Sequence, residues 1–278
     1  MTQIEKLHSL ELKIAIEIRR ICEKNNIPYF ITAGTLLGSV RHGGFIPWDD
    51  DMDIGMLRSD YERFLKACKT DLDNNTYYLQ NWDTDNDYPF SFSKIRLKGT
   101  HIVESFSENS DDKKNGIFVD IFPFDNVPDK IIKQKIQAKK YFICKRLLWI
   151  KKGMGKNMKK HSFKHKSKYY LFKTFSMLFE YENIKRYFKQ TQIRYNNLHT
   201  EKVVTDGSYT YDKESILRDW VINLEPIKFE NESFLAFKAH DEYLKHFYGD
   251  YMKLPPEDKR NRHDVKNINF GKYENNYY

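Results

Sequence analysis

The segment Asp51-Met52-Asp53-Ile54-Gly55-Met56 constrains the fold most, because polar and apolar residues alternate along it. This alternation predicts a half-buried strand, whose side chains point in turn to the two faces of a sheet. Met52 and Ile54 would then face the core, and Asp51 and Asp53 would project together from the other face. Two carboxylates fixed on one strand make a rigid site for a hard divalent cation such as Mg²⁺.

Two further features near this strand fit a site that handles phosphates. Gly34 and Thr35 open a short predicted helix, where backbone N–H groups and the Thr35 hydroxyl can bind phosphate oxygens. Asp120 interrupts an apolar run, residues 117–122, and is the best candidate for a third carboxylate from a neighbouring strand. A cation held by these aspartates could neutralise charge that develops as a phosphoryl bond breaks. An acidic tetrad alone is most often a solvated loop, so the prediction depends on these neighbours.

Basic residues near the acidic segment are weaker candidates for substrate contacts. Lys94 and Arg96 stand two apart on a predicted strand, so both would face one side and could clamp a diphosphate. An exposed strand face explains that spacing equally well. Arg41 and His42 end the short helix, where they would contact phosphate or acceptor, or simply complement the helix C-terminus.

Hydrophobic periodicity and turn residues predict the remaining elements. Helices are expected over residues 4–24, 35–41, 61–69 (with Ser59 or Asp60 as cap), 169–195 and 234–248, and strands over residues 29–33, 51–56, 77–80, 90–97, 101–106 and 117–122. Another helix is expected from Lys130, with an apolar stripe of Ile131, Ile132, Ile136, Phe142, Ile143, Leu147 and Leu148, and with Gly153 and Gly155 after it.

Charge is divided unevenly along the chain. Its 278 residues contain 47 Lys and Arg against 39 Asp and Glu, a formal net charge of +8. Residues 129–200 hold 20 basic and 3 acidic residues, a local charge of +17, whereas the rest holds 27 basic and 36 acidic residues and carries −9. The basic segment favours contact with a polyanion, such as nucleic acid, anionic lipid or a phosphate-bearing polymer; a solvated helical surface is the plainer alternative.

Cysteine usage and hydropathy indicate the compartment. Cys22, Cys68 and Cys144 are far apart, which suggests neither a disulfide framework nor a zinc site and favours a reducing compartment. The N-terminus turns charged too soon for a signal peptide, and no uncharged run approaches the ~18 apolar residues of a membrane span. We therefore expect a cytoplasmic protein, either soluble or peripheral at the inner face of the cell membrane.

The acidic segment and its surroundings resemble the signature of the LicD family, which is named for bacterial phosphorylcholine transferases and is related to fukutin-type glycan-modifying enzymes. The residues that carry the resemblance are Thr32 to His42, Gly44 to Ile54, Phe92 to Arg96, Gly116 to Asp125 and Phe247 to Pro256. The basic segment, roughly 129–200, has no motif that can be matched.

The resemblance implies an α+β fold, with a nucleotidyltransferase-like mixed β-sheet core flanked by helices and a basic, mostly helical insertion. The implied units are a catalytic core over residues 1–128, the insertion over 129–204 and a C-terminal segment over 205–278 that completes the catalytic unit. Asp51 and Asp53 take the metal positions and Asp120 the third carboxylate, while Asp49 lies in the same motif. Met52 replaces the family's usual Ile or Val. Near the C-terminus His263 takes one position of a pair that is usually His-His.

The implied reaction is a Mg²⁺-dependent transfer of phosphocholine from CDP-choline to a sugar hydroxyl of a cell-surface glycan, with release of CMP; Mn²⁺ could replace Mg²⁺. Lys94 and Arg96 would stabilise the leaving CMP, and Asp120 would be either a metal ligand or the base that takes the acceptor proton. Aromatic faces, with Trp48 and Trp82 as candidates, would hold the quaternary ammonium, although a core role is commoner for each.

The partners and the rival functions remain open from sequence alone. The acceptor would be lipopolysaccharide, teichoic acid or a lipid-linked precursor, and the basic insertion would hold the enzyme on anionic membrane or on the acceptor. Another CDP-linked alcohol, such as ribitol or glycerol, is an alternative to choline. A true nucleotidyltransferase that releases pyrophosphate needs the same aspartates. A nucleic-acid-binding module is the least favoured reading, because no recognition motif supports it.

Overall fold

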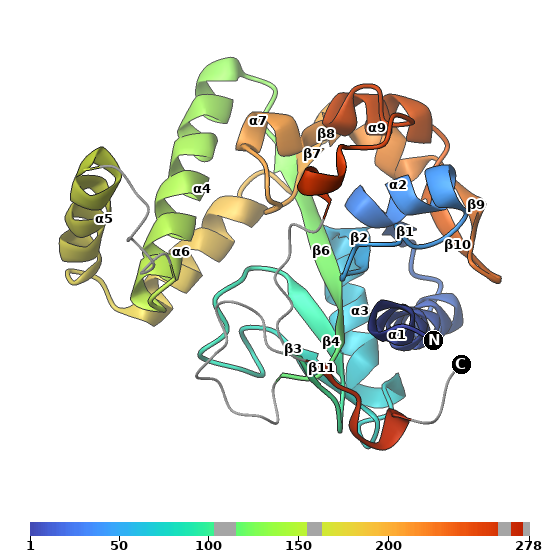
Figure 1. The fold of residues 1–278 in the computed structure, drawn as a ribbon. Helices are drawn as coiled ribbons and strands as arrows, with labels where there is room; N and C mark the ends of the chain where they lie inside the picture. Colours follow the sequence, from blue (N-terminus) through green and yellow to red (C-terminus); the bar gives the residue numbers. More distant parts are fainter. Residues whose placement is uncertain (103–114, 155–162, 261–267, 275–278) are drawn as a thin grey trace.

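The computed structural model describes residues 1–102, 115–154, 163–260 and 268–274 (Figure 1). Its helices are α1 (Gln3–Lys24), α2 (Ala33–His42), α3 (Arg58–Asp71), α4 (Ile131–Lys151), α5 (Phe163–Ser176), α6 (Tyr181–Ile193), α7 (Tyr211–Glu214), α8 (Arg218–Ile222) and α9 (His240–Tyr248). Its strands are β1 (Phe30–Ile31), β2 (Asp53–Leu57), β3 (Tyr77–Gln80), β4 (Ser93–Leu97), β5 (His101–Ile102), β6 (Phe118–Val127), β7 (Lys202–Val204), β8 (Ser215–Leu217), β9 (Leu224–Phe229), β10 (Glu232–Phe237) and β11 (Ile268–Asn269). Among the described helices, none combines the length and hydropathy that crossing a membrane requires.

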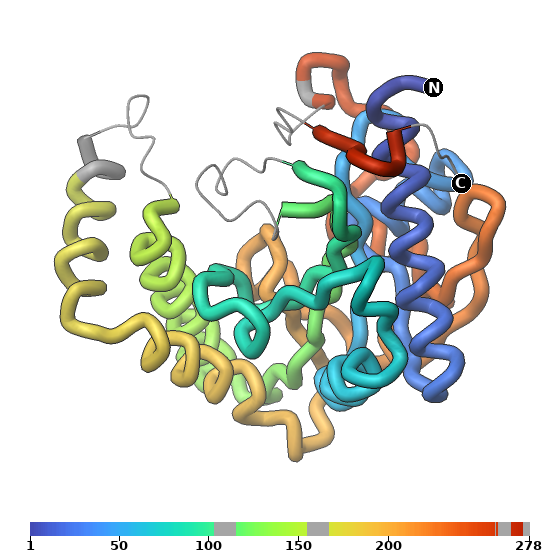
Figure 2. The backbone as a smooth tube through the Cα atoms, turned by 90° about the horizontal axis from the view of Figure 1, so that it is seen from below, coloured from blue at the N-terminus to red at the C-terminus, as the bar shows by residue number. Residues whose placement is uncertain are grey.

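A mixed sheet forms the centre of the molecule, as the α+β prediction expects. Its main path runs β1-β2-β6-β4-β3, with β2 and β6 parallel and the other neighbours antiparallel. The end of β6 pairs with β7, and β7 pairs with β8, both antiparallel. Strands β9 and β10 form a separate hairpin. Helix α1 lies on one side of β6 and the α4–α6 group on the other, which both views show (Figures 1 and 2). The sheet is therefore flanked by helices, and the basic insertion is mostly helical.

Two hydrophobic cores share strand β6. The larger core is built from α1–α3, the sheet and the C-terminal elements, and includes Ile14, Ile54 and Ile121. The smaller core lies under the insertion, where α4 and α6 pack on the end of β6. Trp82 packs on this second core, against Phe188, and its contact with a substrate ammonium stays a prediction. The unit boundaries expected at 128/129 and 204/205 stay a prediction.

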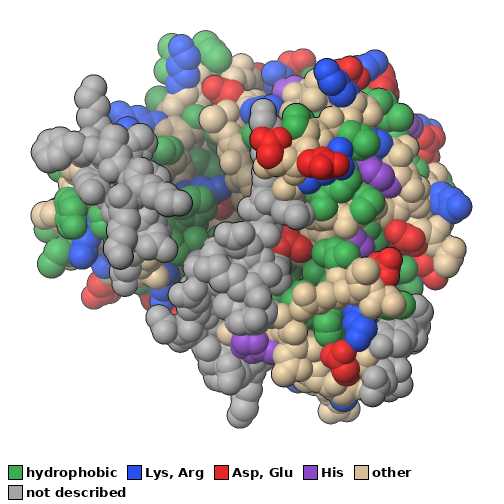
Figure 3. Space-filling view, viewed as in Figure 1, with side chains coloured by type: hydrophobic (Ala, Val, Ile, Leu, Met, Phe, Trp, Pro, Cys, Tyr) green, Lys and Arg blue, Asp and Glu red, His purple; other side chains and the backbone are tan. Residues whose placement is uncertain are grey.

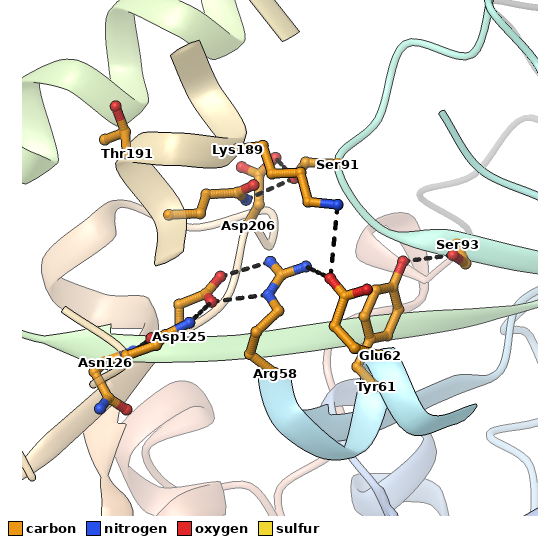
Figure 4. Close-up of polar contacts among 12 residues, drawn as sticks. Arg58, Tyr61, Glu62, Ser91, Ser93, Asp125, Asn126, Lys189, Thr191 and Asp206 are labelled. Carbon is orange, nitrogen blue, oxygen red and sulfur yellow. Dashed lines mark hydrogen bonds and ion pairs between the residues drawn. The ribbon is translucent and has the colours of Figure 1, made fainter. Parts of the chain in front are cut away.

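A buried ion pair joins the two cores (Figure 4). Arg58 opens α3 and donates two hydrogen bonds to Asp125 of β6, at 2.9 and 2.7 Å, and the Asn196 amide donates to the same carboxylate. Burial alone would lower the pKa of Arg58, but Asp125 raises it above its usual value, so the guanidinium stays charged.

Several predicted elements differ from the structure. Helix α2 begins at Ala33, so Gly34 and Thr35 lie inside its first turn, and strand β2 begins only at Asp53. Helix α3 begins at Arg58 without a side-chain cap, so neither Ser59 nor Asp60 caps it. The segment predicted as one helix over 169–195 forms α5 and α6, and the one over 234–248 forms the end of β10 and then α9. The strand predicted over 101–106 is described only at 101–102.

The apolar stripe predicted for α4 is wrong at Ile131, Ile132, Ile136 and Phe142, which are exposed, and is confirmed at Leu147 and Leu148, which are buried. The helix instead buries Gln137, Tyr141, Cys144, Leu147, Leu148 and Ile150. Gln137 can be buried because its amide donates to the Thr191 carbonyl and its oxygen accepts from Tyr211. Gly153 follows the helix with a φ of 74°, as expected for a helix stop, and Gly155 lies outside the described residues.

Candidate active site

Asp53, Asp120 and Lys94 form a row across three adjacent strands. Asp53 of β2 is the parallel partner of Asp120 in β6, and Asp120 is the antiparallel partner of Lys94 in β4. Residues paired in this way point to the same face of a sheet. Lys94 Nζ lies 2.9 Å from Asp120 Oδ1, and only 2% of Lys94 is exposed. The row thus places two carboxylates and one ammonium side by side on a rigid surface.

The N-terminus of α2 is tied directly to the start of this row. The Thr35 hydroxyl accepts a hydrogen bond from the Asp53 backbone N–H at 2.7 Å, so Thr35 positions Asp53 rather than capping the helix. Ala33 has a φ of 50°, a left-handed conformation that costs an alanine free energy. Tyr243 of α9 holds this turn, because its hydroxyl contacts Thr32 Oγ1 and accepts from the Ala33 N–H. The strain is therefore located where α2 meets the acidic residues.

An acidic loop lies against the same helix end. Carboxylate oxygens of Asp49, Asp50 and Asp51 lie within 4.8 Å of one another. A Cβ added to Gly34 would stand 2.7 Å from Asp49 Oδ2, so the glycine lets this carboxylate approach the start of α2. Asp51 lies in the loop, because β2 begins two residues later; the expectation that one strand carries Asp51 and Asp53 is therefore wrong.

The loop and the row form one electrostatic cluster. Burial raises the pKa of Asp53 well above its usual range, and the negative charges of Asp51, Asp120 and Asp49 raise it further, while Lys94 opposes them. Clustered carboxylates of this kind are stabilised by a bound cation, and their oxygens are the ligands that Mg²⁺ prefers.

Sequence reasoning missed Glu11, which belongs to this cluster. Glu11 lies on α1, is 1% exposed, and its Oε2 is buried without a hydrogen-bond partner in the described part of the chain. Burial raises the pKa of Glu11 well above its usual range, and the charges of Asp51, Asp50 and Asp49 add to that effect. A signal was present in the sequence, since Glu11 occupies the apolar stripe of the helix, four residues after Leu7.

Another missed residue, His8, anchors the acidic loop to the same helix. Its Nε2 lies 2.7 Å from the Asp49 carbonyl oxygen, and its ring stacks on Phe45 with centroids 4.2 Å apart. Burial lowers the pKa of His8. The β9–β10 hairpin supports the loop from the other side, because Glu230 accepts from the Phe45 N–H and donates its own N–H to the Gly43 carbonyl.

The structure also places the predicted basic residues. Lys94 and Arg96 face one side, as expected, since both lie over the Phe118 ring, at 3.2 and 4.9 Å from its centroid. The Arg96 guanidinium is buried, however, and donates to Gln80 and to the Gly116 carbonyl at 2.6 and 2.8 Å. Arg96 is thus built into the sheet, and a diphosphate contact for it stays a prediction.

Residues at the end of α2 lie beside the C-terminal segment. Arg41 donates to the Tyr251 carbonyl at 2.8 Å. The His42 and Trp48 rings meet edge to face, with their centroids 5.8 Å apart. The Arg260 guanidinium lies over the Trp48 ring, 4.7 Å from its centroid. Trp48 is thereby fixed close to the acidic loop by a histidine and an arginine. His263, predicted to bind substrate, lies outside the described residues.

Comparisons with known proteins cover the residues of this site. Residues 26–146 match the family model described as LicD/FKTN/FKRP, nucleotidyltransferase domain, a range that includes the acidic loop and the row but not Glu11. The chain is 27% identical over 267 residues to the lipopolysaccharide cholinephosphotransferase LicD of Haemophilus influenzae, covering 92% of this chain and 93% of that protein. It is 42% identical over 40 residues, 14% of this chain and 8% of the relative, to the human ribitol 5-phosphate transferase FKRP.

Proposed function

We propose that the chain, whose residues 26–146 match the LicD family model, is a phosphotransferase that moves phosphocholine from CDP-choline to a sugar hydroxyl of a cell-surface glycan. The similarity over 92% of the chain to a lipopolysaccharide cholinephosphotransferase carries this proposal. In the reaction a bond forms between the acceptor oxygen and phosphorus, the bond from phosphorus to CMP breaks, and the acceptor proton passes to a base. CMP leaves with the bonding electrons.

The acidic cluster would hold the cofactor of this reaction. We propose Mg²⁺, or Mn²⁺ in its place, on Asp51 and Asp53, with Asp49 and Asp120 as the further oxygen donors. The buried, unpartnered Oε2 of Glu11 and the all-oxygen donor set fit a hard cation. When bound, the ion supplies positive charge for the phosphate oxygens as negative charge develops on them.

The chain's own residues would bind the donor and receive the proton. Lys94 brings a buried ammonium to the row, where it can bind a phosphate oxygen or the departing CMP phosphate. Asp120 lies beside it, with Oδ1 2.9 Å from Lys94 Nζ, and would accept the acceptor proton. Trp48 offers an aromatic face for the trimethylammonium group.

A thermal-shift panel tests donor and metal together. Wild-type protein with Mg²⁺ should be stabilised by CDP-choline and less by CDP-ribitol, CDP-glycerol or CTP, because a ligand of the native state raises its stability. The Asp53→Asn variant should keep or exceed the wild-type melting temperature without ligand, lose the Mg²⁺-dependent shift and lose transfer. Stabilisation by CTP with pyrophosphate release would contradict the proposal in favour of nucleotide transfer, and a CDP-ribitol preference would assign ribitol phosphate.

Asp120→Asn separates the two roles of that residue. If Asp120 is a ligand, the variant weakens the Mg²⁺-dependent shift by tenfold or more in apparent affinity. If Asp120 is only the base, the shift is retained and transfer falls by about 10²–10⁴-fold.

We also propose that the insertion docks the enzyme on anionic membrane. An apolar surface, defined here as the exposed side chains Tyr170, Leu171, Phe175, Met177, Leu178 and Phe179, covers α5 and the turn after it. Patches of this kind mark interaction sites. This one belongs to the segment of charge +17, and Figure 3 shows hydrophobic and basic side chains intermingled at that edge of the molecule. Apolar side chains among lysines suit an anionic lipid surface.

Vesicle sedimentation tests this docking surface. Wild-type protein should sediment with phosphatidylglycerol-containing vesicles and not with pure phosphatidylcholine, and Leu171→Ser/Leu178→Ser should weaken sedimentation by tenfold or more. Ile222→Ser, an exposed apolar residue on α8 outside the insertion, is the matched control. Equal sedimentation of the double variant and the control would contradict the proposal.

A further inference from the structure

A pocket lies away from the acidic cluster. It has a volume of about 420 Å³ and lies between α4 and the segment 205–214. Tyr141, Phe142 and Trp149 of α4 form one wall, and Thr205, Tyr209 and Glu214 belong to the other. The volume is in the range of small-molecule sites. None of the residues assigned above to catalysis or to donor binding lines it.

Two buried hydroxyls in this pocket have no hydrogen-bond partner. Tyr141 is 5% exposed and Thr205 is 8% exposed, and neither Tyr141 Oη nor Thr205 Oγ1 has a partner within the described residues. Buried polar groups in folded proteins are nearly always paired, because water is lost to them. Two orphaned hydroxyls on opposite walls of one pocket therefore indicate a ligand that can donate and accept hydrogen bonds.

Acidic side chains outnumber basic ones in the lining of the pocket. Asp206, Asp212 and Glu214 line it, together with Lys145 and Arg146. The Asp206 carboxylate is already engaged, since it lies 2.9 Å from Lys145 Nζ and accepts from Ser91 at 2.7 Å. Glu214 accepts from the Tyr209 N–H at 2.8 Å. Burial raises the pKa of Glu214 to about 7, so near neutral pH this carboxyl can both donate and accept.

The aromatic walls and the orphaned hydroxyls together select the ligand class. A trimethylammonium group would find aromatic faces here, but it has neither an N–H nor a lone pair and would leave both hydroxyls unpaired. A sugar ring stacks its C–H face on aromatic rings and pairs its own hydroxyls with Tyr141 and Thr205. We propose that this pocket binds a neutral sugar unit of the glycan acceptor, which rests on the function proposed above.

A chain of aromatic contacts connects the pocket to the acidic site. The Tyr209 ring lies 5.5 Å from Phe247, and Phe247 lies 4.7 Å from Tyr243. Tyr243 in turn holds Ala33 at the start of α2. The wall of the pocket and the turn at the acidic site thus belong to one packed set of side chains.

Saturation-transfer NMR tests the pocket without requiring turnover. The probes are methyl glycosides of glucose, galactose and N-acetylgalactosamine. Wild-type protein should give saturation transfer to at least one glycoside, and Tyr141→Phe and Thr205→Val, which remove one hydroxyl each, should weaken its binding by tenfold or more. Tyr169→Phe is the matched control, because Tyr169 is equally buried at 5% exposure but lies outside the pocket.

The two proposals fail in different ways. Asp53→Asn should bind the glycoside as wild type does while losing transfer. Sugar binding that depends on Tyr141 and Thr205 without any transfer from CDP-choline would overturn the proposed function and keep the pocket. No glycoside binding, binding that neither substitution changes, or choline binding in place of the sugars would overturn the pocket proposal, whether or not the enzyme transfers phosphocholine.

Discussion

Glu11 is the residue whose position in the apolar stripe of α1 demands an explanation. A carboxyl buried without a full set of partners destabilises the fold, and such groups are retained chiefly where a site uses them. We expect Glu11→Gln to raise the stability of the metal-free protein by about 1 kcal/mol or more, roughly 2–4 °C in melting temperature, while lowering transfer activity. Differential scanning calorimetry beside a CMP-release assay measures both. A less stable but fully active variant would show that Glu11 is only a structural residue.

Glu214 gives the stability of the protein a pH dependence with a definite sign. The unfolded chain loses the Glu214 proton near its usual pKa of 4.5, whereas burial keeps it bound in the folded protein until about pH 7. Stability from this residue is therefore lost as pH rises through that window, by up to ~3 kcal/mol. Glu214→Gln should lack this loss, so its advantage in urea unfolding should widen between pH 5 and pH 8. Parallel pH profiles for the two proteins would contradict the assignment.

At the scale of elements, the close approach of α2 to the glycine loop depends on Gly38. A Cβ at Gly38 would lie 2.4 Å from the Gly44 carbonyl oxygen, a backbone atom that cannot simply rotate away. Gly38→Ala should therefore cost about 1–3 kcal/mol and displace the loop that leads to Asp49, reducing transfer. Gly43→Ala is the comparison, since its Cβ would meet no atom within 4 Å and would only strain a φ of 76°. Thermal unfolding and a transfer assay of both variants measure these effects. Wild-type stability and activity in Gly38→Ala would disprove the steric argument.

Local patterns predicted the elements whose burial follows their own periodicity. The helix over 4–24 agrees with α1, which presents one face to the core, and the strand over 77–80 agrees with β3. Helix α4 departs from its pattern, because paired polar groups such as Gln137 replace isoleucines in the interior. The spacing of its aspartates identified the acidic segment. The alignment of Asp53, Asp120 and Lys94 depends instead on strand register. Glu11 belongs to a helix about forty residues away in sequence. Such long-range juxtaposition is not encoded in any local period.

At the scale of the whole molecule, the Arg58–Asp125 pair links the catalytic core to the core beneath the insertion. Removing one partner leaves a buried charge, so Arg58→Ala should cost about 3–5 kcal/mol in urea unfolding. The double variant Arg58→Met/Asp125→Leu should cost less than Arg58→Ala, because no buried charge remains. An unfolding midpoint of Arg58→Ala equal to that of the wild type would contradict this link between the two cores.

The supports of the acidic loop have a consequence for biosynthesis. The row of Asp53, Lys94 and Asp120 is complete in sequence well before Glu230 and Tyr243 are translated, yet Glu230 holds the loop and Tyr243 holds the strained turn at Ala33. A ribosome-bound nascent chain that has exposed only its first half thus carries the acidic residues without their clamps. The acidic residues would therefore reach their final arrangement only late during translation, when the hairpin and α9 emerge and dock.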